Sequence, residues 1–531
     1  MTMTMTPIEQ LHQAALQATA AKIYSGDRAI SYADLYERSL RVAGGLKKLG
    51  IGRGDRVAFW LPNSLPYLDV LYACMHVGAI GVSINTRFRR AEVESILSRT
   101  GAKAIVLWPG FKDIPFVDIL RELDPAAIAG LRTVILCETS AWTVPIEGVR
   151  VAYHAELVGE APITSEADAD ARSMIFPTSG TTSAPKFAVH TQGRIARHAA
   201  QVASAMGYDA PNAHLLQAVP FCGIYGFSQW VATVAGQASA SLMPLFEPRA
   251  AGDLVRARNI THLNGPDDLL KRLLEAFPDE HPFPSVREVL FASFNPTLSD
   301  FIHEADARGL HIVNGFGMSE IFSFFSRRDT TAPPELRKYP GGVPVNPEAQ
   351  VRVRDTDTGE IAPHGQVGSL EVCSDTLFVE YWGDPDATHA AFTDDGYFIT
   401  GDLASMEDGG SFRLLGRDGD FLRLGGFLVN PAEIETVLKN VSGDVDIVVV
   451  EAASPRGNKA VAFYRLSPGQ TLDEAEVRQR AKGLLADFKV PQHFIHVDAF
   501  PVAISPNGEK IQRRRLKERA AEFVAALITD A

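Results

Sequence analysis

The feature that most constrains the fold of this chain is an alternation of helical and strand-like segments through its first three hundred residues. Ser31 and Asp34 form a capping-box-like start to one predicted helix, which ends at Gly50. Further helical patterns cover 66–77 and 91–99, and strand-like runs occupy 56–61, 80–84, 104–108, 215–219, 240–243, 262–264, 288–292 and 311–314. Alternation of this kind predicts an α/β fold in which parallel sheets are covered by helices.

The pattern changes near Gly341, where strand-like runs become separated by glycine, proline and aspartate turns, at 350–353, 369–373 and 411–415. These runs predict a compact β subdomain. Beyond a charged junction at 416–420, helical patterns alternate with strands at 432–438, 446–451, 460–464, 472–486 and 511–526. We therefore predict a large amino-terminal domain over residues 1–418 and a small α+β carboxy-terminal domain over residues 419–531.

Charge and cysteine usage exclude several classes of protein. The formal net charge is −13, the opposite of what a duplex-binding protein shows, so we expect no nucleic-acid partner and interpret Arg513–Arg515 as a solvated helix face. The four cysteines form no CxxC pair, which argues against a zinc site or a disulfide framework and for buried, reduced thiols. We find no secretory signal and no membrane-spanning stretch, and expect a cytoplasmic enzyme.

The strongest local motif runs from Phe176 to Lys186, Phe-Pro-Thr-Ser-Gly-Thr-Thr-Ser-Ala-Pro-Lys. A strand leads into a loop rich in hydroxyl groups, with one central glycine and a lysine at its end. Backbone N–H groups that turn inward at Gly180, hydroxyl donors and a cation together suit a polyphosphate. The loop lacks the G-K-[ST] of the Walker form, and taken alone it is also compatible with a polar surface loop.

Four further segments follow in order. They are Asn314–Glu320, Tyr397–Leu403 with Asp402, the stretch from Gly416-Arg417 through Gly425-Gly426-Phe427 to Glu435, and Pro506–Arg513 with Lys510. Each has an ordinary structural interpretation on its own, namely a helix start, a turn, a loop before a helix, and a basic helix start. Their joint occurrence in this order is not accidental.

In this order the segments resemble the signature of the adenylate-forming superfamily, which contains acyl-CoA and aryl-CoA synthetases, adenylation domains of peptide synthetases and beetle luciferases. The resemblance extends from about Tyr32 to Leu516 and includes Gly54–Ala58 and Asn85–Arg87. It implies ATP, Mg²⁺ and coenzyme A as cofactors or co-substrates, and a carboxylic acid as substrate. It also implies that the carboxy-terminal domain is mobile, pivoting within Gly416–Asp420.

The resemblance assigns roles to matching residues. Lys510, Glu320 and Lys186 become the catalytic residues, with Glu320 and Thr181 at the metal. The loop from Thr178 to Lys186 would wrap the phosphates, Phe316 would stack on adenine, and Asp402 would bind the ribose hydroxyls. The full set of expected nucleotide-binding residues is Thr178, Ser179, Gly180, Thr181, Thr182, Lys186, Asn295, Gly315, Phe316, Gly317, Ser319, Asp402, Arg417 and Lys510.

Two more groups of residues are implied in the same way. The thiol channel would be lined by Arg423, Gly425, Gly426 and Phe427. The acyl pocket would be lined by Phe221, Cys222, Gly223, Tyr225, Gly226, Phe294, Asn314 and Met318. Many relatives carry histidine at the place of Gly223 and small glycines at the places of Phe294 and Asn295, so the pocket is expected to be reshaped.

Other departures from the common pattern leave the charged groups intact. Ser183 and Phe187 stand where glycines are usual, and Arg423 where lysine is frequent; Glu509 is an extra residue before Lys510. We expect AMP-forming activation of a fatty or aromatic acid, with medium-chain, branched, alicyclic and aryl acids all open. A carrier protein as the acceptor, a non-catalytic ATP-binding relative and a homodimeric assembly remain open alternatives.

Overall fold

The computed structural model describes residues 5–18, 20–138, 146–178, 185–293, 298, 301–424, 427–454, 458–482, 484–505 and 508–529. They fall into two compact units. The first unit comprises Met1–Ser293, Asp300–Gln350 and Val372–Phe398, and the second comprises Phe294–Ser299, Val351–Glu371 and Ile399–Ala531. The second unit thus includes part of the β-rich region ahead of residue 418, and the division between 418 and 419 stays a prediction.

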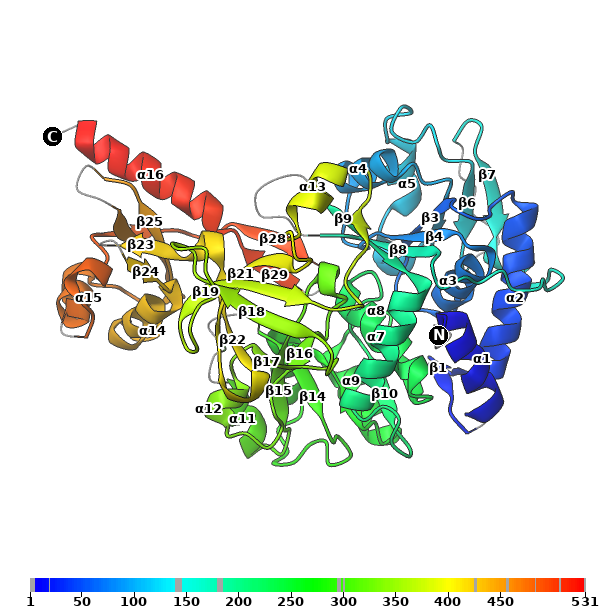
Figure 1. Ribbon diagram of the computed structural model, residues 1–531, viewed down its shortest axis with the longest axis horizontal. Coiled ribbons are helices and arrows are strands. Elements are labelled where there is room, and N and C mark those ends of the chain that lie inside the picture. Colours follow the sequence, from blue (N-terminus) through cyan, green and yellow to red (C-terminus); the bar gives the residue numbers. More distant parts are fainter. Residues whose placement is uncertain are drawn as a thin grey trace. The chain divides into compact units, whose positions relative to one another are not determined.

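The first unit contains an eight-stranded sheet of order β20-β9-β8-β4-β3-β5-β6-β7 (Figure 1). Its strands are β3 (Arg56–Trp60), β4 (Ile80–Ser83), β5 (Ala104–Leu107), β6 (Thr133–Leu136), β7 (Arg150–Tyr153), β8 (Arg172–Pro177), β9 (Phe187–Thr191) and β20 (Glu380–Tyr381). The pairings from β8 through β4, β3, β5 and β6 to β7 are parallel, whereas β9 and β20 add to the edge antiparallel.

Helices cover both faces of this sheet, as the alternation of its sequence requires. Val57 and Phe59 face α2 (Tyr32–Lys48) and α3 (Leu65–Val77), while the intervening Ala58 and Trp60 face the opposite layer with α4 (Arg90–Thr100) and α5 (Phe116–Arg121). Each fully buried apolar side chain of this size contributes about 1.5–3 kcal/mol to folding. The predicted α/β architecture with helix-covered parallel sheets is confirmed.

A second sheet of the first unit has the order β12-β10-β11-β1-β2 and is mainly parallel. Its strands are β1 (Ile23–Ser25), β2 (Arg28–Ile30), β10 (His214–Gln217), β11 (Ser239–Leu242) and β12 (His262–Leu263). A third group runs β13 (Gly265–Pro266), β14 (Val289–Ala292), β15 (Ile312–Phe316), β16 (Ser326–Arg327) and β17 (Gly341–Pro344). The first three of these are parallel and the last two return antiparallel.

The first unit contains further helices besides those that cover the eight-stranded sheet. They are α1 (Pro7–Gln17), α6 (His154–Val158), α7 (Gln192–Ala205), α8 (Ile224–Ala235), α9 (Pro248–Ala257), α10 (Asp267–Glu275), α11 (Phe301–Ala307), α12 (Pro334–Arg337) and α13 (Pro385–Ala390). Helix α8 is buried on almost every side, with Trp230 fully enclosed. Among the described residues, none of the helices combines the length and apolarity needed to span a bilayer.

The second unit begins with short strands and ends in an α+β region. Its strands are β18 (Gln350–Arg354), β19 (Val367–Cys373), β21 (Phe398–Met406), β22 (Phe412–Arg417), β23 (Leu422–Leu424), β24 (Phe427–Val429), β25 (Asp446–Ala452), β26 (Lys459–Arg465), β27 (His493–His496), β28 (Val502–Ser505) and β29 (Gly508–Ile511). Its helices are α14 (Pro431–Ser442), α15 (Glu474–Lys482) and α16 (Arg513–Thr529). Strands β25, β26 and β27 form one small sheet with helices packed against it.

Three sequence predictions in this unit were wrong in detail. The last helix begins at Arg513 and not at Ile511, because Ile511 pairs with Val502 in β29. The helix expected over 472–486 is shorter and covers Glu474–Lys482; its start follows Asp473, whose carboxylate accepts from the first free N–H groups of α15. Arg513 is not on a solvated face, because its side chain is 14% exposed and forms an ion pair with Glu435.

The four cysteines differ in exposure and form no disulfide in the described structure. Cys74, Cys137 and Cys222 are buried, Cys373 is half-buried, and all four are free. Burial raises the pKa of the Cys222 thiol to about 12. In the part of the chain that the structure describes, no group of three or more histidine, cysteine or acidic side chains is placed to hold a metal ion.

Candidate active site

A cluster of three side chains in the first unit joins two of the residues predicted to be catalytic. Glu320 lies in a single turn of 3₁₀ helix (Ser319–Ile321) after β15 and is 5% exposed. The Tyr381 hydroxyl donates to Glu320 Oε1 at 2.9 Å. The ammonium nitrogen of Lys186 lies 4.6 Å from the centroid of the Tyr381 ring, a distance typical of a cation–π contact. We call Lys186, Tyr381 and Glu320 the lysine–tyrosine–glutamate cluster.

The base of the predicted phosphate loop is closed beside this cluster. Thr178, just past the end of β8, donates its backbone N–H to the Lys186 carbonyl at 2.7 Å. Pro185 O accepts from the Arg99 guanidinium at 2.6 Å, and that guanidinium stacks 4.5 Å from the centroid of the Phe187 ring. Phe187 is the first residue of β9, and its side chain is buried in the core. The bulky residue in place of glycine therefore anchors this end of the loop. Ser179, Gly180, Thr181 and Thr182 lie outside the described residues.

The backbone around Glu320 is held in an unusual conformation by its neighbours. Phe322, Ser323 and Phe324 have φ values of 61°, 57° and 45°, in the left-handed region that side-chain-bearing residues rarely occupy. The Phe322 ring is fully buried and meets the rings of His190 and His198 edge-on, at 4.7 and 5.2 Å. Such strain persists only where packing over-determines it. A Cβ on Gly317 would come within 2.6 Å of Ser323, so the turn also requires glycine there.

His190 supports the same turn from the sheet. It lies on β9, is fully buried, and its Nε2 is 2.8 Å from the Ser319 carbonyl, to which it donates. Burial lowers the pKa of His190 to about 3, so the ring is neutral in the folded protein at ordinary pH. The sequence analysis did not single out His190, because a histidine in a strand carries no signal by itself.

The second unit brings Asp402 and Arg417 together as direct cross-strand partners in β21 and β22. Arg417 Nε lies 3.1 Å from Asp402 Oδ1, and its Nη1 donates to the Thr400 carbonyl at 2.9 Å. Asp402 is 5% exposed. A bulge between Leu403 and Ala404 sets this register, since an unbroken ladder from Met406 and Phe412 would pair Asp402 with Gly416.

The residues predicted for the acyl pocket surround the start of α8 and the neighbouring β14 and β15. Gly223 is the N-cap of α8, and Tyr225 donates from its hydroxyl to the Leu290 carbonyl at 2.8 Å. Asn314, opposite Phe291 in the adjacent strand, donates to the Lys338 carbonyl at 2.7 Å. A Cβ on Gly226 would meet the Pro220 carbonyl at 2.3 Å, so this glycine is needed for packing. Phe221 and Cys222 are buried just before α8, and Gly315, Phe316, Gly317, Met318 and Ser319 follow Asn314 in chain order.

Several predicted positions are only partly described. Phe294, Asn295, Gly425 and Gly426 lie outside the described residues, and of Arg423, Phe427 and Lys510 the structure describes the backbone alone. Lys510 stands in β29 opposite Ala503. Three residues later, the half-buried Arg513 contacts Glu435 of α14 at 2.6 Å. Burial opposes the charge on Arg513, but Glu435 outweighs it, and the pKa of the guanidinium lies above its ordinary value.

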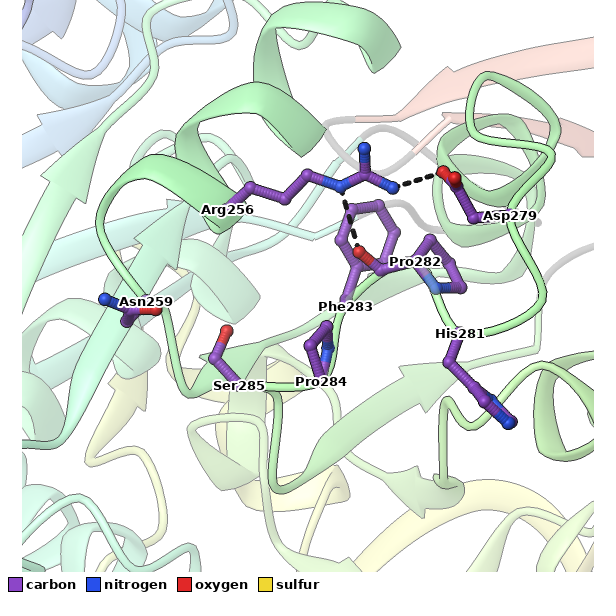
Figure 2. A pocket seen from close by; sticks show the side chains of 8 residues that line it. All are labelled: Arg256, Asn259, Asp279, His281, Pro282, Phe283, Pro284 and Ser285. Carbon is purple, nitrogen blue, oxygen red and sulfur yellow. Dashed lines mark hydrogen bonds and ion pairs between the residues drawn. The ribbon is translucent and has the colours of Figure 1, made fainter.

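A surface hollow of about 340 Å³ lies elsewhere in the first unit, between the end of α9 and the loop after α10 (Figure 2). Its Arg256 faces Asp279 in an ion pair and donates to the Pro282 carbonyl at 3.0 Å. The eight lining residues include none of those predicted for ATP, acid or thiol. The hollow is therefore separate from the candidate site.

Tyr381 is the residue that sequence reasoning missed. It stands in the segment Tyr381-Trp-Gly-Asp-Pro-Asp-Ala-Thr388, where Asp384 caps α13 and proline follows it, so the sequence indicates only a strand edge and a helix start. Its partner Glu320 is 61 residues away along the chain. Only the pairing of β20 with β9, which sets Tyr381 opposite Ala188, brings it to Lys186 and Glu320.

Comparison with known proteins identifies the family. Residues 10–382 match the family described as AMP-binding enzyme, and residues 433–506 match the AMP-binding enzyme C-terminal domain. The chain is 26% identical over 528 residues to a mitochondrial medium-chain acyl-CoA ligase of Rattus norvegicus, covering 93% of this chain and 84% of the relative. It is 27% identical over 503 residues to a long-chain-fatty-acid–CoA ligase of Mycobacterium tuberculosis, covering 94% and 95%.

The fold comparison agrees with the sequence comparison. The crystal structure of ATP-bound MatB from Rhodopseudomonas palustris superimposes with a TM-score of 0.83 at 26% identity, covering 98% of this chain and all of that one. Together, the ordered motifs, the sheets and the two matched family regions show that this chain belongs to the AMP-binding enzyme family, within the adenylate-forming superfamily that includes the acyl-CoA ligases.

Proposed function

We propose that this enzyme activates a carboxylic acid with ATP, releasing pyrophosphate, and transfers the acyl group from the resulting acyl-adenylate to coenzyme A. The observation that carries the proposal is the lysine–tyrosine–glutamate cluster, where a cation and a buried carboxylate from distant segments contact the same tyrosine beside the closed base of a hydroxyl-rich loop. This is the combination of groups that binding and polarising a polyphosphate requires.

The chemistry explains the need for positive charge. A carboxylate oxygen attacks the α-phosphorus while the bond to the bridging oxygen breaks, and pyrophosphate leaves in line. Both reactants are anionic, so Lys186 and Lys510 are proposed to offset charge on the phosphates and on the attacking carboxylate. Groups that are fixed in advance around developing charge usually make the largest contribution to catalysis.

Mg²⁺ is expected to arrive with ATP. In nucleotide enzymes this ion uses one or two protein carboxylates together with substrate phosphates, so the buried carboxylate of Glu320 fits as such a ligand. When bound, the ion supplies positive charge to the phosphate oxygens. Thr181 stays a proposed second ligand.

The ribose is proposed to bind at Asp402. A carboxylate can accept from two hydroxyl groups at once, and the cross-strand guanidinium of Arg417 fixes its orientation. Phe316, at the end of β15, is proposed to lie against adenine.

Transfer to coenzyme A is supported by the relatives, which are named as acyl-CoA ligases. In this step the thiol attacks the acyl carbonyl, AMP leaves, and a proton is lost from sulfur. The β23–β24 hairpin, with the backbone of Phe427 opposite Leu424, is proposed to line the path of the thiol. A carrier protein remains the alternative acceptor.

The proposal is tested by pyrophosphate release from ATP over a panel of medium-chain, branched, alicyclic and aryl acids. We expect release that depends on one class of acid, and acyl-CoA and AMP among the products, detected by mass spectrometry, once coenzyme A is added. No acid-dependent release would overturn adenylate formation. An acyl-adenylate that transfers to a carrier protein but not to coenzyme A would overturn the second step alone.

A further inference from the structure

We propose that Tyr381 is a positioning residue that joins Lys186 to Glu320 and sets the response of the site to Mg²⁺; this rests on the proposed function. Tyr381 contacts both residues through different parts of its side chain. Its hydroxyl donates to Glu320 Oε1 at 2.9 Å, and the face of its ring meets the Lys186 ammonium group at 4.6 Å from the centroid. The side chain is 4% exposed, so both contacts are sheltered from water.

The backbone of Tyr381 is fixed from two sides. Tyr381 pairs with Ala188 in β9, and Lys186 directly precedes the first residue of that strand, so the pairing of β20 with β9 brings the two side chains close. Its N–H donates to Thr388 Oγ1 at 2.9 Å, and Thr388 Oγ1 in turn donates to the Asp384 carbonyl at 2.8 Å. The tyrosine is therefore held by an edge strand and by the first turn of α13.

The segment that carries Tyr381 also holds the backbone of Glu320. Phe378 donates its N–H to the Glu320 carbonyl at 2.7 Å, and its ring packs 4.6 Å from that of Tyr381. Glu320 thus accepts hydrogen bonds at two places, from Phe378 at its carbonyl and from Tyr381 at its carboxylate. A displacement of this segment would move the carboxylate and the lysine together.

The chemistry of a phenol suits this role. A hydroxyl that donates to one carboxylate oxygen restrains rotation of the carboxylate but adds no charge, so the attraction of Glu320 for a cation is preserved. The ring face attracts Lys186 without neutralising it. A basic residue in the place of Tyr381 would instead compete with Mg²⁺ for Glu320.

A purely structural role for Tyr381, as an aromatic packed on Phe378, makes different predictions from the positioning role. Tyr381→Phe keeps the ring and its packing and removes only the hydrogen bond, whereas Tyr381→Leu also removes the cation–π contact. Hydrogen bonds to charged groups are worth roughly tenfold to a hundredfold in an equilibrium. We expect Tyr381→Phe to raise the Mg²⁺ concentration for half-maximal pyrophosphate release about tenfold or more, and Tyr381→Leu to raise the KM for ATP as well.

The matched control is Tyr464→Phe. Tyr464 donates to Glu474 Oε1 at 3.3 Å on β26 of the second unit, so the control removes the same kind of bond away from the cluster. We expect its Mg²⁺ response to equal that of the unaltered enzyme. If Tyr381→Phe does not fold, Thr388→Val serves as a second variant, because it removes the acceptor of the Tyr381 N–H; a weaker shift in the same direction is expected.

Calorimetric titration with ATP, with and without Mg²⁺, gives a readout that is independent of turnover. We expect Tyr381→Phe to bind metal-free ATP with the affinity of the unaltered enzyme. The increase in ATP affinity that Mg²⁺ confers should be smaller in the variant by a factor of about ten or more. An unchanged Mg²⁺ response of Tyr381→Phe would overturn the positioning role. If the unaltered enzyme binds ATP but no acid promotes pyrophosphate release, the proposed function fails while the titration still decides the role of Tyr381.

Discussion

Two buried carboxylates among the predicted site residues, Glu320 in the first unit and Asp402 in the second, are equally shielded from water but contact different kinds of partner. Each is 5% exposed. Glu320 accepts a hydrogen bond from the neutral hydroxyl of Tyr381, whereas Asp402 is in contact with the guanidinium of Arg417. The phenol leaves the carboxylate charge intact, and the guanidinium offsets it.

The difference indicates two kinds of ligand. A carboxylate whose charge is preserved in a buried place attracts a cation, in keeping with the proposed Mg²⁺ site. A carboxylate already offset by arginine remains a good acceptor for hydroxyl groups without demanding a further cation, in keeping with the ribose. The comparison therefore predicts that loss of Glu320 changes the dependence on metal and loss of Asp402 changes the affinity for nucleotide.

The largest loss of activity is expected at Lys510, which is outside this pair. The losses expected at Glu320 and Asp402 can be compared with it. Lys510→Ala should abolish adenylate formation, with a loss of roughly a thousandfold, by analogy with removal of a donor from an oxyanion hole. Thioester formation from supplied acyl-adenylate and coenzyme A should remain largely intact, as followed by release of AMP. Equal losses in the two half-reactions would contradict the proposed role of Lys510.

Glu320→Gln should come next. The substitution removes the charge but keeps a hydrogen-bonding oxygen, and we expect pyrophosphate release to fall about a hundredfold with a greatly increased requirement for Mg²⁺. The measurement is the rate as a function of Mg²⁺ concentration at saturating ATP. Glu335→Gln is the control, because the side chain of Glu335 is 62% exposed on α12. A Glu320→Gln variant with an unchanged Mg²⁺ requirement would contradict the proposed role of Glu320 at the metal.

Asp402→Asn should have a smaller effect on activity than Glu320→Gln, and the effect should fall on the affinity for ATP. Loss of a charged acceptor for the ribose hydroxyls should raise the KM for ATP roughly tenfold to a hundredfold, with little change in the Mg²⁺ requirement. The KM for ATP lacking both ribose hydroxyls should differ little between the variant and the unaltered enzyme. If the variant discriminates between the two nucleotides as strongly as the unaltered enzyme does, Asp402 does not bind the ribose.

The smallest effect concerns the stability of the folded protein in acid. It involves His190, which donates to the carbonyl of Ser319, the residue before Glu320. Burial lowers the pKa of His190 to about 3, from an ordinary value of 6.5. Between these values the unfolded chain binds a proton that the folded chain does not, so this contribution to stability is complete above pH 6.5 and is lost as the pH falls. Each such histidine contributes up to about 1.4 kcal/mol per pH unit to this loss.

His190→Gln tests this by keeping an N–H donor for Ser319 while removing the titration. The free energy of unfolding, measured by urea denaturation between pH 6.5 and 4.5, should fall less steeply with acid in the variant. His303→Gln, at a histidine that is 46% exposed on α11, is the control substitution. An equally steep fall in His190→Gln would show that the ring is not held neutral by the fold.

The sequence predicted the layers of the fold because their causes are local. A strand such as β3 alternates its side chains between two helical layers, and β4 and β5 recur after helices of the lengths that parallel crossovers need. The order of the five motifs likewise led to the family. By contrast, the end of β29 and the low exposure of Arg513 could not be predicted, because they depend on pairing with Val502 and on the distant Glu435.

By itself, the sequence determined the residue types that the chemistry needs and the order in which they occur: Lys186, Glu320, Asp402, Arg417 and Lys510. The tertiary structure decided which of the described side chains meet. A bulge of one residue sets Arg417, and not Gly416, opposite Asp402. The edge strand β20 places Tyr381 in contact with Glu320, which is 61 residues away along the chain. Register and edge pairing depend on long-range packing, which the spacing of a local motif does not encode.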